Sequence, residues 1–368
     1  MSSVSTKMMQ AAAGSGGGDE YIYMYAYPSI IKVSTVDASV VASVDYYNDS
    51  SIGNGQRPDH LIFGDDGKLY VAGYYYIHRF NPDTLAQEER SALRSSNTLL
   101  QGITYYDGYL YSWHTPGTGS VAEWKIQANN LSGGFTTVTT GTFGYRGYKH
   151  GVSFNGSGRR CYASRKYTYG LNGFDFAPTG TDVSVSNNNA QGIVAMHYYD
   201  GWWVGPFYSG KTYSVQDGTT SPLNQSFALG GDAFQAYRMS NDGLLVFAYP
   251  FSVQSAVIGS SGLSGSKNND ISIRGSSPSY NPTNQYLTGA LPSKNEYRVV
   301  FLTFESETVG GNSCMRLAKC DLNTNTVTAI GLVDPTTDIG GSTNHSIGNN
   351  SALFTSTVTK AEMEWDAP

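Results

Sequence analysis

The sequence predicts an all-β fold in which one four-stranded unit repeats around a ring. Three observations support this prediction: a recurring hairpin pattern, a regular spacing between its copies, and a composition rich in Gly, Tyr and other strand and turn residues. The copies recur at intervals of about 40 to 50 residues, which is the length of one β-propeller blade. We therefore predict a single β-propeller of seven or eight four-stranded blades.

The repeated hairpin is clearest at residues 101–113. Gln101–Tyr106 and Tyr109–Trp113 read as two strands joined by Asp107-Gly108. A tight turn of the primed type needs positive φ angles, which Gly adopts at little cost and Asp tolerates. The same unit recurs with turns at Asp66-Gly67, Asn155-Gly156, Asp200-Gly201 and Asp242-Gly243, and in degenerate form at Asn349-Asn350.

The units at the two ends of the chain are incomplete. Tyr21–Tyr27 aligns with the second strand of the next unit, so no first strand precedes it. At the other end we expect strands at Leu353–Thr357 and Lys360–Trp365 and no fourth strand. We expect the two termini to close the ring together, which removes open sheet edges. We count eight second strands, which predicts eight blades, or seven if the two ends of the chain form one blade together. The eight strands contain Ile22, Leu69, Leu110, Cys161, Trp202, Leu245, Val299 and Leu353.

Residues 1–19 differ from the propeller, which we assign to residues 20–368. Ala11–Gly18 contains only small residues and reads as a linker. The apolar stretch before it is too short and too polar for the core of a signal peptide. We predict that this flexible segment docks onto a partner through Lys7, Met8, Met9, Gln10, Ala11, Ala12 and Ala13.

Composition excludes several classes of protein. Charged residues make up 14% of the chain and the net charge is −6, which argues against a nucleic-acid surface. No apolar run is long enough to insert into a membrane as a helix. Of three cysteines, Cys314 and Cys320 are expected on one strand, about 20 Å apart, which is too far for a disulfide. We predict that these two and Cys161 are free thiols.

Six units begin their innermost strand with a polar residue. The first strand of each propeller blade lines the central channel, so these residues predict a ring of Gln and His at one channel mouth. Gln and neutral His both donate and accept hydrogen bonds, so the ring could hold a small polar ligand, water or a metal ion. We favour a hydrated or structurally satisfied ring; its members are His60, Gln101, His150, Gln191, Gln235 and His345.

The repeat pattern, His or Gln, then Gly, then Ile or Val, with a following Asp-Gly turn, resembles that of NHL and streptogramin-lyase-like propellers. In the lyases a channel-mouth His acts with acidic groups and a metal, which points to His60, His150 and His345. Here Gln replaces His at three positions, and Asp59 is the one carboxylate adjacent to the ring in sequence. We therefore predict no catalytic residue, metal or cofactor, and keep a lyase or glycan-degrading enzyme as the alternative.

The N-terminal residues 3–14, Ser-Val-Ser-Thr-Lys-Met-Met-Gln-Ala-Ala-Ala-Gly, resemble the short leader of virion structural proteins of marine tailed phages. This resemblance implies a non-enzymatic component of a capsid, tail or fibre, displayed on the particle. Its location would be the virion, after synthesis in the host cytoplasm. Other virion subunits are the implied partners, and a host-surface glycan is a further candidate ligand.

Overall fold

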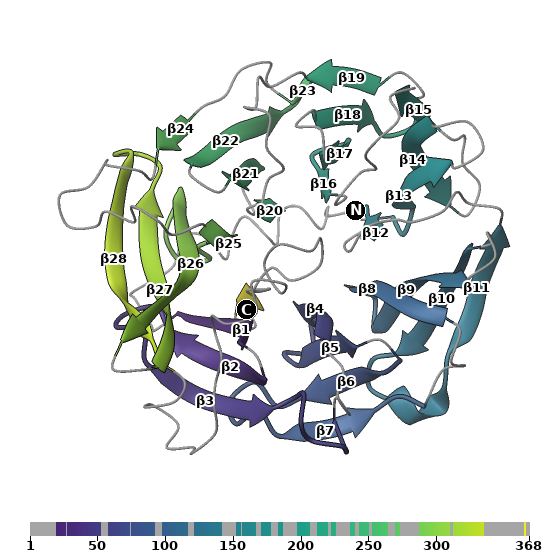
Figure 1. The fold of residues 1–368 in the computed structure, drawn as a ribbon. Helices are drawn as coiled ribbons and strands as arrows, with labels where there is room; N and C mark the ends of the chain where they lie inside the picture. The colour runs from purple at the N-terminus through teal and green to yellow at the C-terminus, as the bar shows by residue number, and fades with distance from the viewer. Residues whose placement is uncertain are drawn as a thin grey trace.

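The computed structural model of the chain is a ring of antiparallel sheets (Figure 1). The described residues are all-β, as predicted, apart from one short 3-10 turn, η2 (Leu131–Gly133). The structure describes residues 20–26, 28–52, 58–73, 75–92, 98–116, 121–141, 152–155, 157–166, 171–177, 183–186, 197–206, 212–219, 222–225, 236–239, 243–249, 252–263, 269–272, 287–309, 312–334 and 364–365.

The described strands form seven sheets, which we number in chain order. Sheet 1 contains β29 (Glu364–Trp365), β1 (Tyr21–Ala26), β2 (Ser29–Ser34) and β3 (Val40–Asp45). Sheet 2 contains β4 (Pro58–Phe63), β5 (Leu69–Gly73), β6 (Ile77–Phe80) and β7 (Gln87–Arg90). Sheet 3 contains β8 (Thr98–Tyr106), β9 (Tyr109–Pro116), β10 (Val121–Gln127) and β11 (Thr136–Gly141).

The second half of the ring repeats this order. Sheet 4 contains β12 (Val152–Phe154), β13 (Arg160–Lys166), β14 (Leu171–Ala177) and β15 (Val183–Ser186). Sheet 5 contains β16 (His197–Tyr199), β17 (Trp202–Pro206), β18 (Thr212–Gln216) and β19 (Pro222–Gln225). Sheet 6 contains β20 (Ala236–Met239), β21 (Leu244–Tyr249), β22 (Ser252–Gly259) and β23 (Gly262–Leu263), with β24 (Asn269–Ser272) also paired to β22. Sheet 7 contains β25 (Leu287–Pro292), β26 (Val299–Val309), β27 (Asn312–Asp321) and β28 (Thr326–Val333).

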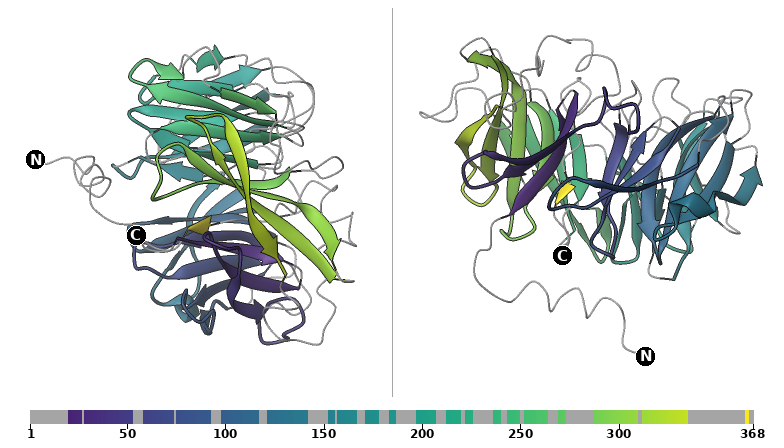
Figure 2. Two further views of the ribbon diagram at one scale, coloured as in Figure 1. Left: turned by 90° about the vertical axis from the view of Figure 1, so that its left-hand side faces the viewer. Right: turned by 90° about the horizontal axis from the view of Figure 1, so that it is seen from below.

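Within each sheet the first strand lies nearest the centre of the ring and the last strand lies at the rim (Figure 1). The strands run roughly from one face of the ring to the other, so the turns gather on these two faces (Figure 2). Because successive strands run antiparallel, the turns after the first and third strands lie on the same face. We call this the hairpin face.

The two ends of the described chain meet in sheet 1. β29 pairs with β1, with Ile22 opposite Trp365 and Tyr23 opposite Glu364. β29 therefore supplies the innermost strand that the N-terminal unit lacks. The strand expected at Leu353–Thr357 lies outside the described residues.

Two of the predicted Asp-Gly turns have the expected geometry, whereas at Asp66-Gly67 only Gly67 has a positive φ. Asp107 and Gly108 have φ angles of 50° and 76°, and Asp200 and Gly201 have 45° and 84°. Two positive φ angles in succession define the primed turn that joins twisted strands. The turn is also tied to the end of the third strand in four sheets, by backbone hydrogen bonds from Ala128 to Gly108, Asp217 to Gly201, Ile258 to Gly243 and Leu322 to Arg298.

The core consists of apolar layers between neighbouring sheets. Tyr23, Leu61 and Val71 are buried between sheets 1 and 2, and Tyr70 and Ile103 between sheets 2 and 3. Similar layers lie between sheets 6 and 7 and between sheets 7 and 1. Four tyrosines are buried in these layers: Tyr23, Tyr25, Tyr46 and Tyr70.

The cysteine prediction is confirmed. Cys161, Cys314 and Cys320 are free and buried. Cys314 and Cys320 both lie on β27. Among the described residues, no helix has the length and hydropathy needed to cross a membrane.

Candidate functional site: the channel mouth and the hairpin face

The structure describes part of the predicted polar ring. His60 lies in β4, and the backbone of Gln101 lies in β8, both innermost strands. The remaining ring residues, His150, Gln191, Gln235 and His345, lie outside the described residues, as do the docking residues 7–13. The ring as a whole therefore stays a prediction.

Each of these two innermost strands carries a β-bulge near its start. Asp59 and His60 together oppose Ala72 on β5, whereas Gln101 and Gly102 oppose Trp113 on β9. Bulges of this kind place two residues opposite one and are frequent beside functional sites.

The register on either side of the bulge shows which residues correspond. Leu61 pairs with Val71 in sheet 2, and Ile103 pairs with Ser112 in sheet 3. Counting back from these pairs, Gln101 occupies the position of Asp59, and His60 that of Gly102. The two described ring residues are thus one position out of register, which sequence alignment alone missed.

His60 connects two sheets. Its side chain is only 6% exposed, and its Nδ1 lies 3.2 Å from the backbone nitrogen of Ile103 on β8. The Ile103 N–H donates, so Nδ1 must be unprotonated and the neutral ring carries its proton on Nε2. This contact gives His60 a structural role between sheets 2 and 3.

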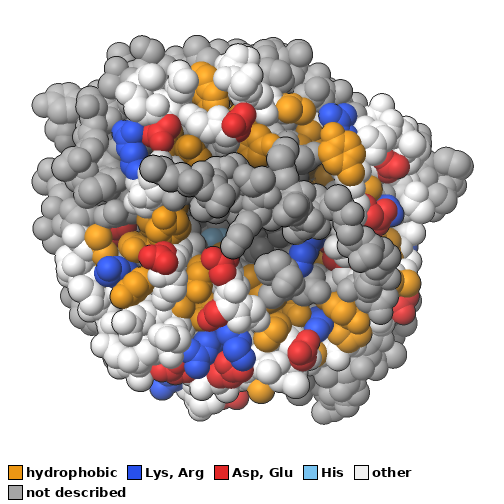
Figure 3. Space-filling model, turned by 180° about the vertical axis from the view of Figure 1, so that it is seen from behind, with side chains coloured by type: hydrophobic (Ala, Val, Ile, Leu, Met, Phe, Trp, Pro, Cys, Tyr) orange, Lys and Arg blue, Asp and Glu red, His pale blue; other side chains and the backbone are white. Residues whose placement is uncertain are grey.

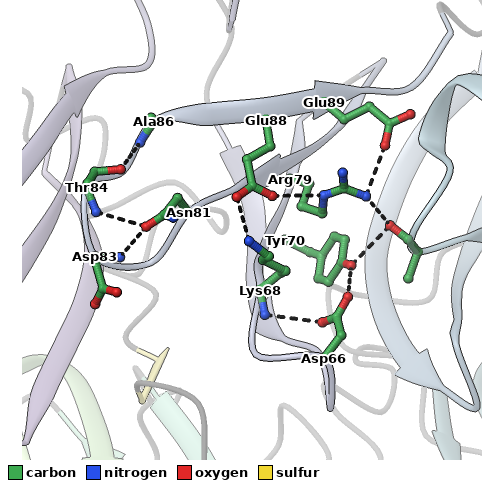
Figure 4. A network of polar contacts seen from close by, with 11 residues as sticks. Asp66, Lys68, Tyr70, Arg79, Asn81, Asp83, Thr84, Ala86, Glu88 and Glu89 are labelled. Carbon is green, nitrogen blue, oxygen red and sulfur yellow. Dashed lines mark hydrogen bonds and ion pairs between the residues drawn. The ribbon is translucent and has the colours of Figure 1, made fainter.

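The best-defined polar cluster lies on the hairpin face between sheets 2 and 3 (Figure 4). The Tyr70 hydroxyl lies 2.6 Å from Asp66 Oδ2 and 3.1 Å from the Ala128 carbonyl oxygen. Arg79 donates to the same carbonyl at 2.9 Å. Burial, together with the Asp66 carboxylate, raises the pKa of Tyr70. The cluster therefore ties the first turn of sheet 2 to the third strand of sheet 3.

Two glutamates of β7 complete this cluster. Arg79 Nε contacts Glu88 at 3.2 Å, and Arg79 Nη1 contacts Glu89 at 3.0 Å. Lys68 also binds Glu88 at 2.5 Å, and this hydrogen bond lowers the pKa of the Glu88 carboxyl. Glu89 in turn accepts the backbone N–H of Ser132 from sheet 3 at 2.9 Å. Each acid has a basic or N–H partner, an arrangement that stabilises its charged form.

An equivalent link joins sheets 4 and 5. Asp217 Oδ1 accepts from Arg159 at 2.6 Å and from the Trp203 indole at 3.1 Å. Asp217 Oδ2 accepts from the Asn155 amide at 2.8 Å. Again a turn of one sheet is bound to a turn of its neighbour.

A third link fixes the residue at which the described chain begins. Glu20 is 5% exposed, and its carboxylate accepts from the Ser293 hydroxyl and the Lys294 N–H, each at 2.7 Å. Its carbonyl oxygen accepts from Thr35 N at 3.1 Å and from Thr35 Oγ1 at 2.8 Å. Glu20 therefore binds sheet 7 through its side chain and sheet 1 through its backbone.

Sequence reasoning missed these three acidic links. The partners of Asp66, Asp217 and Glu20 lie in other repeats, so no local spacing identifies them. Each of these carboxylates accepts hydrogen bonds from neighbouring donors, an arrangement suited to stabilising sheet junctions. Among the described residues, no group of three or more His, Cys, Asp or Glu side chains could hold a metal ion.

Comparisons with known proteins identify the fold. No family model matches the chain, and no curated protein matches its sequence. Many solved structures resemble it at low sequence identity, and three of them illustrate the likeness. A catalytically inactive virginiamycin B lyase from Staphylococcus aureus with quinupristin has a TM-score of 0.52 and 12% identity, covering 74% of this chain and 84% of that one.

Of the other two structures, one is described as a β-propeller domain and the other as WD40 repeats. The Myceliophteria thermophila Cps50 (Swd1) β-propeller domain has a TM-score of 0.51 and 9% identity, covering 74% of this chain and 88% of that one. The RRP9 WD40 repeats have a TM-score of 0.50 and 13% identity, covering 76% and 81%. At these identities the likeness shows the fold alone: the chain resembles NHL- and WD40-like β-propellers.

Proposed function

We propose that this protein is a non-enzymatic structural component of a phage particle: a seven-bladed propeller, closed by the β29–β1 pairing, that is displayed on the capsid, tail or fibres. Two observations support the proposal. Residues 3–14 resemble a virion leader, and the body to which they are attached has the fold of β-propellers. Its partners would be other virion subunits, and a host-surface glycan is a further candidate ligand.

Glu20 supports the docking role that we propose for residues 1–19. A peptide tether transmits position only if its root is fixed, and Glu20 is held by four hydrogen bonds between sheets 7 and 1. Residues 1–19 are therefore attached to a rigid point at the junction where the propeller closes. A short segment that becomes ordered against a partner can then dock the whole ring.

The charge distribution is compatible with a protein partner. On the face shown in Figure 3, acidic and basic side chains lie next to one another, so neither sign dominates its described part. An interface of mixed charges favours partners of matched pattern over a uniformly charged polymer.

Particle incorporation tests the proposal. Full-length protein and a variant lacking residues 1–19 would be supplied to assembling particles, and the protein in purified particles would be quantified. We expect the truncated protein to fold normally and to be absent from the particles. Equal incorporation of the two would contradict the docking role.

A lyase or glycan-degrading enzyme is the second candidate, because His60 lies on an innermost strand, where the resemblance to the lyases places a channel-mouth His. Elemental analysis combined with substitution of His60, His150 and His345 separates the two. A bound metal and an activity that the substitutions abolish would support the enzyme and refute a purely structural protein.

A further inference from the structure

One arrangement of side chains repeats at three successive sheet junctions. A tyrosine on the second strand of one sheet faces the next sheet, where it meets an aromatic ring near the end of the first strand. The ring pairs are Tyr23 with Phe63 at 5.1 Å, Tyr70 with Tyr105 at 6.0 Å, and Tyr111 with Phe154 at 4.7 Å. The junctions between sheets 1 and 2, 2 and 3, and 3 and 4 therefore share one design.

A basic residue accompanies each of these tyrosines on the third strand. Residues directly opposite one another in antiparallel strands project to the same side of the sheet. The opposite pairs are Tyr23 with Lys32, Tyr70 with Arg79 and Tyr111 with Lys125, and the equivalent pair in sheet 7 is Phe301 with Lys319. Four sheets thus place a positive charge at the same position, on the side facing the next sheet.

Three of these four basic residues pair with a carboxylate. The pairs are Lys32 with Asp83, Arg79 with Glu88 and Glu89, and Lys319 with Glu296. In the described part of the chain Lys125 has no such partner, and its ammonium lies 4.3 Å from the centre of the Tyr109 ring. Glu123, the one acid of β10, is fully buried. Lys125 is therefore the member of the set whose charge the protein leaves unpaired.

The sequence explains why Lys125 lacks a partner. Asp83, the partner of Lys32, lies in the turn after the third strand of sheet 2. By alignment of the strands, the corresponding position in sheet 4 is Gly180, which has no side chain to supply an anion. The alignment rests on the opposite residues Phe63, Leu69 and Phe80 in sheet 2 and Phe154, Arg160 and Ala177 in sheet 4.

Partly exposed aromatic rings surround Lys125. Tyr106 lies opposite Tyr109 across the turn between β8 and β9, which is on the hairpin face. Tyr111 lies 6.5 Å from Tyr109, and the Phe154 ring contacts Tyr111 at 4.7 Å and Tyr106 at 4.4 Å. All five side chains are partly exposed. We call these contiguous residues the Lys125 patch: Tyr106, Tyr109, Tyr111, Lys125 and Phe154.

Acidic side chains near this region act on the opposite side of sheet 3. Tyr105 faces sheet 2, and burial together with the carboxylates of Asp66, Asp65 and Asp107 raises the pKa of its hydroxyl. Lys125 projects toward sheet 4 instead. The Lys125 patch therefore combines aromatic rings with a positive charge.

These groups fit one kind of ligand. An ammonium group pairs with a single carboxylate as a point charge, and tyrosine rings offer an apolar face together with a hydroxyl for hydrogen bonding. A sugar acid has the matching parts: a carboxylate, a C–H face and hydroxyls. β9 and β10 are paired along both edges, so the patch offers no strand edge to a peptide.

We propose that the Lys125 patch binds a carboxylate-bearing sugar of an acidic glycan. The carboxylate pairs with Lys125, and the sugar ring packs against Tyr109 and its aromatic neighbours. This inference rests on the proposed function, in which a host-surface glycan is a candidate ligand, and it gives that ligand a site and a chemical class.

Calorimetric titration of the full-length protein tests the proposal. The probes are tetragalacturonate and its methyl ester, which keeps the sugar rings and removes the charge. At low salt the acid should bind about threefold or more tightly than the ester. K125Q should bind both probes as wild type binds the ester, because the substitution and the esterification remove the same interaction. No binding of the acid at millimolar concentration, or an unchanged preference for it in K125Q, would overturn the proposal.

Two further variants make the test specific to this site. K319Q makes the same change of charge at the equivalent position of sheet 7 and should bind as wild type does. A loss equal to that in K125Q would reveal a general effect of charge and would overturn the proposal. Y109A should weaken binding of acid and ester alike, because it removes contact with the ring of the sugar. Unchanged binding of both probes would contradict that contact.

A peptide of the same charge tests the competing kind of partner. Tetraglutamate also carries four side-chain carboxylates but no sugar ring, so it should bind about threefold or more weakly than tetragalacturonate. Equal or tighter binding of tetraglutamate would indicate an acidic protein partner and would overturn the glycan assignment.

The site and the proposed docking role fail separately. K125Q should enter particles as wild type does, because residues 1–19 are intact. Absence of sugar binding would refute the Lys125 site, while incorporation could still depend on residues 1–19. Incorporation of the truncated protein would refute docking, while its sugar binding could still depend on Lys125.

Discussion

Two neighbouring sheet junctions are built from the same repeat but are not equally well sealed. A sealed junction here means one whose aromatic rings are fully buried and whose two sheets are joined by polar links. Tyr70 of sheet 2 and Tyr111 of sheet 3 occupy equivalent positions on their second strands, opposite Arg79 and Lys125 respectively. Tyr70 is fully buried against sheet 3. Tyr111 faces sheet 4, with its ring 4.7 Å from that of Phe154, and remains partly exposed.

The difference originates in the turn between the first two strands. In sheet 2 this turn contains Asp66, which reaches the Tyr70 hydroxyl. In sheet 3 this turn is the two-residue turn Asp107-Gly108, in which both residues have positive φ angles. Arg79 binds the Ala128 carbonyl across the junction, whereas Lys125 lies over the Tyr109 ring of its own sheet at 4.3 Å.

The comparison shows that the repeat specifies strands, and the turn sequence specifies how a sheet attaches to the next. Aromatic side chains fill both junctions. At the sheet 3–4 junction Tyr106 stacks on Phe154 at 4.4 Å, and both rings remain partly exposed. At the sheet 2–3 junction polar links close the layer. Three predictions test this difference and a fourth tests the junction on the other side of sheet 2; they follow in order of expected effect, the largest first.

Tyr70→Ala should destabilise the protein far more than Tyr111→Ala. Removing a fully buried large aromatic ring costs about 3–5 kcal/mol, because a cavity remains. The partly exposed ring of Tyr111 should cost about 1 kcal/mol. Urea unfolding midpoints of the two variants would measure the difference, and equal midpoints would show that the two junctions are equally sealed.

Acid should weaken the junction between sheets 1 and 2, on the other side of sheet 2, through His78. This residue of β6 is fully buried, contacts the rings of Tyr46, Tyr76 and Phe80, and has a pKa lowered by burial to about 4. The unfolded chain takes up this proton near pH 6.5, so stability is retained above that pH and falls as pH drops toward 4.

The loss attributable to His78 should be about 2–3 kcal/mol. The groups around it are Gln87, whose side chain lies 3.2 Å from Nδ1, and Arg90, whose charge further lowers the pKa. Unfolding of wild type and His78→Gln at pH 7 and pH 4.5 isolates the contribution. A wild-type loss no greater than that of His78→Gln would remove His78 as the cause.

Arg79→Met should cost more than Lys125→Met. Arg79 neutralises Glu88 and Glu89 and binds a backbone carbonyl, so its loss should cost about 1–2 kcal/mol. Lys125 and the Tyr109 ring that it contacts are both partly exposed, so the loss of Lys125 should cost about 0.5 kcal/mol. Thermal unfolding of both variants at equal salt would measure the ranking, and its reversal would contradict the assigned roles.

Lys125→Arg should have the smallest effect. It reproduces the Tyr–Arg pair of sheet 2 in sheet 3, but the Asp107-Gly108 turn supplies no counterpart of Asp66. Stability should therefore change by less than about 0.5 kcal/mol. A gain near 1 kcal/mol would show that the arginine, rather than the turn, determines how well a junction is sealed.

The strand content and the turns were predictable because they depend on local sequence. Asp107-Gly108 and Asp200-Gly201 join their strands with two positive φ angles, which Gly adopts readily and Asp tolerates, and alternating apolar residues continue each hairpin. Free Cys314 and Cys320 followed from strand geometry alone. These features need no knowledge of distant residues.

The contacts between repeats were not predictable. His60 meets the Ile103 N–H and Asp217 meets Arg159 because neighbouring sheets bring them together. The bulges at Asp59 and Gln101 also changed the register within the predicted ring, since an inserted residue leaves no mark in a hydrophobic pattern. Such contacts arise only once the ring geometry is known.

The β29–β1 pairing has a consequence for how the protein forms. Ile22 and Trp365 lie far apart in the sequence, so the sheet that contains β1 is completed by a strand synthesised after all the other described strands. Contacts between such distant residues slow folding, because the chain must close a very long loop before they can form. During synthesis, one edge of β1 would therefore stay unpaired until Glu364 and Trp365 are available, and a chain truncated before Glu364 would keep that edge unpaired.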